Sequence, residues 1–305
     1  MDSGTLFYRN LRYNEFDVSE MGIPWTIRIL DLGREDRWNW VKLPVFLSRG
    51  TGWKNLYVNA GSGIDGLADL KGKRVCVPEY NMSICMWLRV LLQELHGIEP
   101  GQIEWFNGRH KDERQAGVLG VEEDKPAEIR LHHLAAHQRP DEMLERGELD
   151  AAVFMDDTSA GSIDRYANTG RENNPKIRKL FPDGGRGLIK EFYDRTGVFQ
   201  LNHHVIVQRR LVEKHPWMVA ELFDAFQQSK ITAYRNFDAS SGGALPASVP
   251  DFAWERSLFG SDPYPFGITA MRGSFDRYIQ AMLDGKVIDR RFAMEEVYDP
   301  ATHGT

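Results

Sequence analysis

The sequence predicts an α/β protein of two lobes, the second inserted into the first. Its 305 residues are enough for two units at roughly 150 residues each. Apolar runs typical of buried strands alternate with segments of helical periodicity, and the middle of the chain reads as a βαβ series, which requires a largely parallel sheet. Strands before and after this series do not fit into its sheet, so we assign them to the first lobe.

Each expected element follows from its local pattern. The expected strands lie at 42–47, 55–59, 74–77, 102–106, 151–154 and 204–207, and the expected helices at 82–96, 140–146 and 216–234. The first helix carries an apolar stripe closed by Gly97, and the last has Pro216 near its first turn. We expect the chain to leave the first lobe near Leu70 and to return near Leu201. The lobes would then be 1–72 plus 202–305 and 73–201, with a ligand cleft between them.

Composition narrows the class of protein and of partner. Hydrophobic residues make up 42% and charged residues 27%, which excludes disordered and collagen-like chains. The formal net charge of −6 argues against nucleic acid as a partner. No basic segment followed by an apolar run opens the sequence and nowhere do 18 apolar residues follow one another, so we expect neither export nor a membrane span. The only cysteines, Cys76 and Cys85, favour reduced thiols and a cytoplasmic location.

Two motifs suggest a nucleotide-binding loop and a metal site, but the sequence around each motif argues against that function. The segment Gly-Ser-Gly-Ile-Asp-Gly at 61–66 matches a dinucleotide fingerprint, but too few residues separate it from the next strand for the helix that the fingerprint needs. A second motif contains His132, His133 and His137, of which the last two have the spacing of one helical face. Because its surroundings are polar and charged, we favour a surface role over a metal site, and we expect no bound metal.

Polar residues follow several of the expected strands, at the end where open α/β sheets bind ligands. Glu20, Arg49, Glu79 and Tyr80 are of this kind. A ligand site and a salt bridge between the lobes explain these residues equally well.

Two further pairs of residues are candidates. Asn81 and Ser83 begin the helix after one such strand, where free N–H groups suit a carboxylate or phosphate, although N-capping explains them equally well. His203 and His204 lie where the chain returns between the lobes. Histidine is suited to proton transfer near neutral pH, but residue type alone favours a structural histidine.

A series of segments between about residue 7 and about residue 234 resembles the 4,5-dihydroxyphthalate decarboxylase family. The most telling are Phe-Asp-Val-Ser-Glu-Met at 16–21, Pro-Val-Phe-Leu-Ser-Arg at 44–49 and Tyr-Asp-Arg-Thr-Gly-Val-Phe at 193–199. Asp-Leu-Lys-Gly-Lys at 69–73 and Gly-Glu-Leu-Asp-Ala at 147–151 are shared with the wider type II periplasmic-binding-protein superfamily. The resemblance implies an α/β, two-lobed, type II periplasmic-binding-protein-like fold with a ligand cleft between the lobes.

The resemblance also implies an activity, which is decarboxylation of a hydroxylated aromatic acid without a cofactor. His203 would be the general acid, Glu20 or Glu79 the base on the phenol side, and Arg49 and Arg89 the carboxylate anchors. Tyr80, Asn81, Ser83 and Thr196 would line the substrate site. The partner is a small aromatic carboxylate, and a homo-oligomer is left open. The alternative is not an enzyme but a solute-binding protein of the transporter type. It stays open because the fold alone does not distinguish a decarboxylase from a solute-binding protein.

Overall fold

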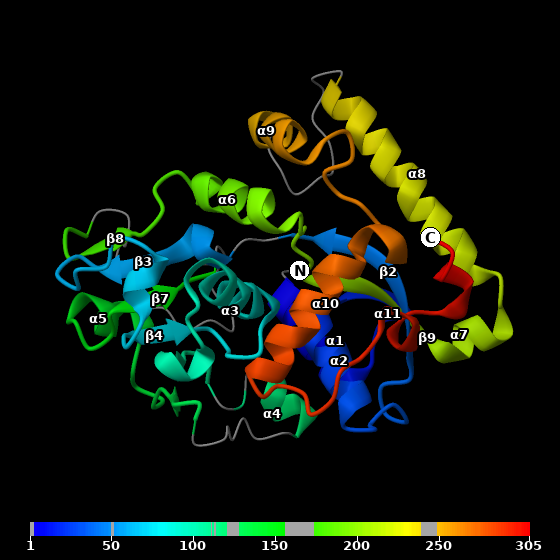
Figure 1. Ribbon diagram of the computed structural model, residues 1–305. Coiled ribbons are helices and arrows are strands. Elements are labelled where there is room, and N and C mark those ends of the chain that lie inside the picture. Colours follow the sequence, from blue (N-terminus) through cyan, green and yellow to red (C-terminus); the bar gives the residue numbers. More distant parts are fainter. Residues whose placement is uncertain are drawn as a thin grey trace.

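The computed structural model describes residues 3–49, 52–110, 112, 114–120, 128–155, 174–238 and 249–305. They form two separate sheets (Figure 1). The smaller is antiparallel, with the order β1 (Val18–Gly22), β9 (His203–Gln208), β2 (Trp40–Ser48). The larger has the order β6 (Leu131–His133), β5 (Glu104–Asn107), β4 (Arg74–Val77), β7 (Ala151–Val153), β3 (Leu56–Asn59), β8 (Ile177–Lys179). The predicted two-lobed α/β fold is confirmed.

Helices cover both sheets. Those of the first half of the chain are α1 (Ser3–Tyr13), α2 (Ile23–Asp31), α3 (Ser83–His96), α4 (Gln115–Leu119) and α5 (Pro140–Glu145). Those of the second half are α6 (Arg186–Thr196), α7 (Arg209–Lys214), α8 (Met218–Asp238), α9 (Val249–Phe259), α10 (Ile268–Asp284) and α11 (Met294–Val297). As predicted, α3 ends at Gly97, which has the left-handed conformation (φ 62°) that glycine adopts without strain. Within the described residues, no helix is both long enough and apolar enough to span a membrane.

One expected boundary is wrong. The expected division after residue 72 places β3 in the first lobe, but β3 pairs with β7 and β8 in the larger sheet. A buried apolar strand does not reveal by itself which sheet it joins, and β3 runs antiparallel to β7, so it lies outside the parallel pattern on which the division was based. The chain therefore passes from the smaller sheet to the larger between Ser48 and Leu56.

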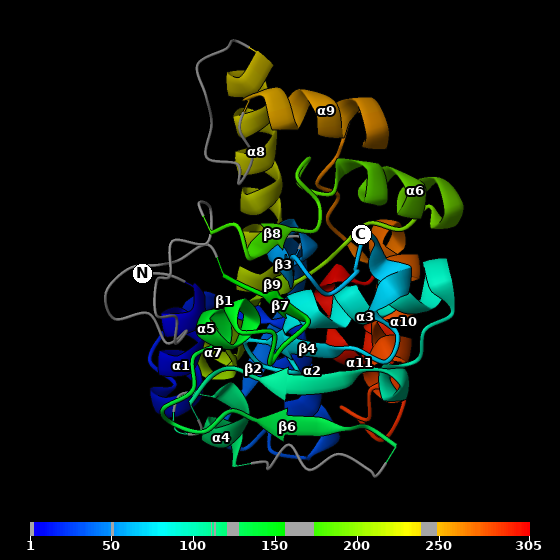
Figure 2. The same ribbon diagram turned by 90° about the vertical axis from the view of Figure 1, so that its left-hand side faces the viewer.

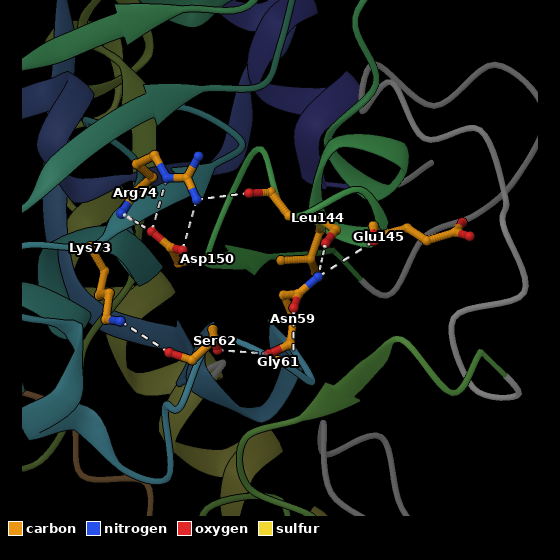
Figure 3. A network of polar contacts seen from close by, with 9 residues as sticks. Asn59, Gly61, Ser62, Lys73, Arg74, Leu144, Glu145 and Asp150 are labelled. Carbon is orange, nitrogen blue, oxygen red and sulfur yellow. Dashed lines mark hydrogen bonds and ion pairs between the residues drawn. The ribbon is translucent and has the colours of Figure 1, made fainter.

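The glycine motif at 61–66 forms a structural turn rather than a nucleotide loop. It is followed by a 3-10 helix, Leu67–Leu70, and lies at the amino ends of β4 and β7, whereas ligands bind at the carboxyl ends. In Figure 3 the Lys73 ammonium donates to the carbonyl of Ser62 at 3.0 Å, and the Asn59 amide donates to the carbonyl of Leu144 at 2.8 Å. Beside them, the Arg74 guanidinium binds Asp150 through two hydrogen bonds of 2.9 and 3.0 Å.

The two sheets are tied together by a continuous apolar core. Helix α3 lies beside α10 in both views (Figures 1 and 2), and one cluster of buried side chains includes Ile27 on α2, Val75 on β4, Trp87 on α3 and Phe275 on α10. Two smaller contacts add to this. Helix α4 packs against α1, and α9 contacts α6 through the Tyr193 and Phe259 rings, 4.8 Å apart. The larger sheet is thus held to the smaller one at several points.

A buried lysine in the smaller sheet gives a testable dependence of stability on pH. Lys42 on β2 is 4% exposed. Burial lowers its pKa to about 8, an effect that Glu35 opposes and Arg209 strengthens. Between about pH 8 and the usual lysine range the unfolded chain binds more protons, so stability from this group rises with pH. Lys42→Met is therefore expected to raise the free energy of unfolding by about 2 kcal/mol at pH 7, and by less at pH 9.5. Urea unfolding at the two pH values measures this, and a gain that does not depend on pH would contradict it.

Candidate active site

The centre of the candidate site is an ion pair between Glu20 on β1 and His203 at the start of β9. The register of these antiparallel strands places Gly22 opposite His203, so Glu20 is two residues away on the same face. The Nδ1 atom of His203 lies 3.2 Å from Oε2 of Glu20, and the side chains are 14% and 22% exposed. The Phe7 ring and the imidazole pack edge to face, with their centroids 4.7 Å apart.

The electrostatics of the pair favour an ionised carboxylate. Burial by itself would raise the pKa of Glu20, but the hydrogen bond and charge of His203, with a smaller effect of Ser3, lower it below its usual value. An ionised Glu20 accepts a proton-bearing Nδ1, which fixes the orientation of the ring. Within the described residues Nε2 has no hydrogen-bond partner, so it is the nitrogen that can meet a ligand.

The amino end of α3 lies beside this pair. The Ser83 hydroxyl donates to the carbonyl of Asn202 at 2.8 Å, and the Ile23 N–H donates to the same carbonyl at 3.0 Å. Gly22 is next to the start of α3, since a β-carbon there would be in van der Waals contact with the Ser83 hydroxyl oxygen at 3.5 Å. The first N–H groups of a helix have no intrahelical acceptor, and the positive end of its dipole favours an anion. Met82 is the N-cap residue, and no side-chain cap hydrogen bond is present, so N-capping by Asn81 or Ser83 is wrong.

His204, the neighbour of His203, is structural. It is fully buried, with Nε2 2.9 Å from the Thr26 hydroxyl and Nδ1 3.1 Å from the Tyr298 hydroxyl. Because Thr26 donates its proton to the carbonyl of Ile23, it accepts from Nε2–H, and Nδ1 accepts from Tyr298. Burial, and then the charges of Lys42 and His203, lower the pKa of His204 well below its usual value, so the ring stays neutral.

Glu79, the other candidate base, binds protein groups. It is fully buried, and its two oxygens accept the N–H groups of Ala116 at 2.8 Å and Gln115 at 3.1 Å. Arg109 lies 3.5 Å from one of these oxygens. These contacts hold the start of α4. Of the two candidate bases, Glu20 is the one in contact with His203.

The two candidate anchors also bind protein groups. Arg49 forms an ion pair with Glu255 at 3.4 Å and donates to the carbonyl of Pro263. The cavity that Arg49 lines with Glu255 has a volume of only about 30 Å³, far below the roughly 300–1,000 Å³ of sites that bind small organic molecules. Arg89, on α3, donates to the carbonyl of Tyr80 at 2.9 Å and lies over the ring of that tyrosine at 4.0 Å.

The remaining predicted site residues have local structural contacts. The Tyr80 ring packs against Trp105 at 5.6 Å, and Asn81 is 4% exposed just before α3. The Thr196 hydroxyl donates to the carbonyl of Phe192 at 2.7 Å and accepts the N–H of Val198, which ends α6. The structure thus brings Glu20, Ser83 and His203 together, while the contacts described for Glu79, Arg49, Arg89, Tyr80 and Thr196 lie elsewhere.

Sequence reasoning missed a polar group at the carboxyl ends of β5 and β6. There Nδ1 of His133 accepts from the Arg114 guanidinium and lies 3.2 Å from the Asn107 amide nitrogen, so its ring proton is on Nε2. Position directly after an expected strand is the signal that points to this group, but the polar and charged surroundings favour a solvated insert. His133 lies on β6, a strand, so the helical spacing with His137 is wrong. His132 binds Glu104 at 2.9 Å, and the described residues contain no group of three metal-ligating side chains.

The comparisons with known proteins agree with the motifs. No family model matches the chain. The chain is 27% identical over 303 residues to a 4,5-dihydroxyphthalate decarboxylase of Comamonas testosteroni, and the matched region covers 99% of this chain and 87% of that protein. It is 26% identical over 192 residues to the enzyme of the same name from Pseudomonas putida, and the matched region covers 63% of this chain and 69% of that protein.

The solved structures that match the chain are more distant in sequence. The periplasmic aliphatic sulphonate binding protein SsuA of Escherichia coli has a TM-score of 0.49 at 14% identity, covering 99% of this chain and 86% of that one. The desulfurization enzyme DSZB has a TM-score of 0.47 at 15% identity, covering 98% and 88%. By its motifs and by its similarity to two curated relatives, the chain resembles the 4,5-dihydroxyphthalate decarboxylase family.

Proposed function

We propose that this chain is a carboxy-lyase that releases carbon dioxide from a hydroxylated aromatic acid such as 4,5-dihydroxyphthalate, using its own side chains. The similarity to two decarboxylases supports the reaction class. The observation that carries the proposal is the partly buried Glu20–His203 pair beside the amino end of α3. Such a pair is a proton carrier, which a decarboxylase needs and a solute receptor does not.

The proposed reaction begins with proton transfer to carbon. Protonated His203 donates from Nε2 to the ring carbon that bears the carboxylate, while the conjugated phenol loses its proton to Glu20. The ring is then a dienone, which can accept the electrons of the next step. Glu20 also stabilises the imidazolium before transfer, because the two groups have opposite charges at 3.2 Å.

Carbon dioxide leaves in the second step. The C–C bond to the carboxylate breaks, its electron pair restores the aromatic ring, and the negative charge moves to the phenol oxygen. Glu20 returns the proton to this oxygen, and His203 takes a new proton from water, so each carbon dioxide released consumes one proton. The N–H groups at the start of α3 suit the remaining carboxylate.

The activity is tested by measuring carbon dioxide release from a panel of hydroxyphthalates and hydroxybenzoates, with calorimetric binding of the same compounds. We expect release from at least one dihydroxyphthalate with no cofactor added and with chelator present. Binding of panel members without any release would instead favour a solute-binding protein. Release that stops with chelator would show that the reaction depends on a metal.

A further inference from the structure

We propose that a cavity between α3 and α10 is a second ligand site, which takes a small carboxylic acid with a hydroxyl or amino group at its other end. The cavity has a volume of about 290 Å³, close to the lower end of the range for sites that bind small organic molecules, roughly 300–1,000 Å³. It lies where the two helices run side by side (Figure 1), and Pro100 completes its wall.

Arg89 gives the buried end of this cavity a positive charge. The residue is only 3% exposed, and its Nε atom is buried without a hydrogen-bond partner. Its Nη1 donates to the carbonyl of Tyr80, and its Nη2 lies 2.7 Å from the sulfur of Met86. Within the described residues, no carboxylate forms an ion pair with this guanidinium. A buried cation without a counter-ion is costly, so the site favours an anion.

Protein groups offset only part of this charge. The guanidinium lies 4.0 Å from the centroid of the Tyr80 ring and 5.8 Å from that of Trp105, and aromatic faces attract cations. Gly285, which ends α10, packs so closely that a β-carbon there would lie 3.3 Å from Nε. The negative end of the α10 dipole is therefore near Arg89. Rings and a helix end supply partial charges, whereas a carboxylate supplies a full one.

The other walls indicate the shape and the far end of the ligand. Glu94 and Arg277 neutralise each other as an ion pair of 3.2 Å, and Val90, Pro100 and Ala281 supply apolar surface for a ring or short chain. The end away from Arg89 carries the exposed Asp276, because its neighbour Arg277 pairs with Glu94, five residues beyond Arg89 on α3. The half-buried Asp284 precedes Gly285 and so lies on the Arg89 side, where its carboxylate accepts from Gln280 at 2.8 Å. Arg291 on the rim donates to the same Gln280. The Asp276 carboxylate suits a donor such as a hydroxyl or amino group, at the end opposite the carboxylate held at Arg89.

This site is separate from the proposed active site. Arg89 lies six residues after Ser83 on α3, which is about 9 Å along the helix axis at 1.5 Å per residue. The remaining α3 residues of the cavity, Val90, Gln93 and Glu94, lie still farther from the amino end. The inference does not depend on the proposed decarboxylase activity.

The location is tested with crystals of the whole protein soaked in 3-bromo-4-hydroxybenzoate, whose bromine gives an anomalous signal. We expect a bromine peak between α3 and α10, whether or not a second peak is present near His203. Calorimetry with 4-hydroxybenzoate then measures affinity in solution. Arg89→Met removes the charge, and Ala281→Phe fills the cavity while keeping Arg89. Each is expected to weaken the corresponding binding event at least tenfold. Arg272→Met, which breaks an exposed ion pair with Glu295 on the same helix, is the matched control and should bind as the wild type does.

Three outcomes would overturn the proposal. The first is the absence of bromine from the cavity. The second is a peak in the crystal with no solution binding that depends on Ala281, which means binding at crystal concentration only. The third is unchanged affinity in a folded Arg89→Met protein. If Arg89→Met fails to fold, Ala281→Phe decides alone. Failure of the decarboxylation assay would leave the bromine position and these affinities unaffected, so the two proposals fail separately.

Discussion

Replacing His203 with alanine is expected to lower the rate of carbon dioxide release by roughly 10²–10⁴-fold while leaving substrate affinity nearly unchanged. The reason is that a general acid acts chiefly in the transition state, so its loss affects turnover far more than binding. Single-turnover release and calorimetry on the same variant separate the two quantities. His96→Ala, which removes the exposed histidine at the end of α3, is the matched control and should keep full activity.

Glu20, the partner of His203, can be tested in the same assay through the pH dependence of turnover. Glu20→Gln removes the carboxylate that orients the imidazole and stabilises its charged form, so it should also slow turnover. Because the pKa of Glu20 is lowered in the folded protein, the pair contributes stability above the usual glutamate pKa, and this contribution is lost as pH falls through the folded value. Because Glu20 takes the phenol proton only in its ionised form, its protonation also slows turnover at acid pH, and the acid side of the rate profile should change in Glu20→Gln. An unchanged profile, or a His203→Ala protein that loses binding and turnover equally, would contradict the assigned roles.

Much of the fold was predictable because it depends on local patterns. The apolar stripe and the glycine stop gave α3 to within one residue at its start, and the strand preceding it was read correctly as β4. The position of β3 was not predictable in the same way. Its four residues, Leu56–Asn59, form an antiparallel strand between β7 and β8, and only tertiary contacts determine which sheet such a short apolar strand joins.

The candidate site was predictable in part, for a similar reason. Glu20 and His203 are 183 residues apart, and only the register of β1 on β9 shows that they touch. The resemblance to a family, rather than residue type, selected His203 over His204. Position after a strand left a ligand role and a salt bridge open for Arg49 and Glu79, and the structure shows an ion pair for each, with Glu255 and with Arg109. It did not reveal that Glu79 binds the start of α4, because the residues that occupy its oxygens come from a segment read only as polar.

The position of Arg49 after a strand suggests a substrate anchor, but its contacts give it a structural role. Its replacement is expected to have a large effect on the free energy of unfolding. It directly follows β2, where the chain leaves the smaller sheet. Its guanidinium lies 4.5 Å from the ring centroid of Tyr264, 4.7 Å from that of Phe259 and 5.8 Å from that of Phe199. The ion pair with Glu255 adds α9 to this cluster. Arg49 therefore holds α9 against both crossings of the chain between the sheets, because Phe199 lies just before the return to β9.

Arg49→Met is expected to lower the free energy of unfolding by about 2–4 kcal/mol, because it removes these contacts and leaves Glu255 without its cation. The Arg49 and Glu255 side chains are 8% and 17% exposed, so solvent replaces the lost interaction only in part. Substrate affinity should change much less than stability. The alternative, that Arg49 anchors a substrate carboxylate, predicts the reverse, with affinity weaker by about 2–5 kcal/mol and stability unchanged.

The double variant Arg49→Met, Glu255→Gln distinguishes these roles further. Burial raises the pKa of Glu255 and Arg49 opposes that rise, so removal of Arg49 leaves a carboxylate that is costly to ionise. A folded-state pKa above the unfolded one means that stability falls as pH rises through this window, and the defect of Arg49→Met should therefore be smaller at pH 5 than at pH 8. Glu255→Gln removes the buried charge, so the double variant should recover part of the loss at pH 8 and show little dependence on pH. If the second substitution recovers nothing, the Arg49 charge does not act through Glu255, and the aromatic rings alone must account for its effect.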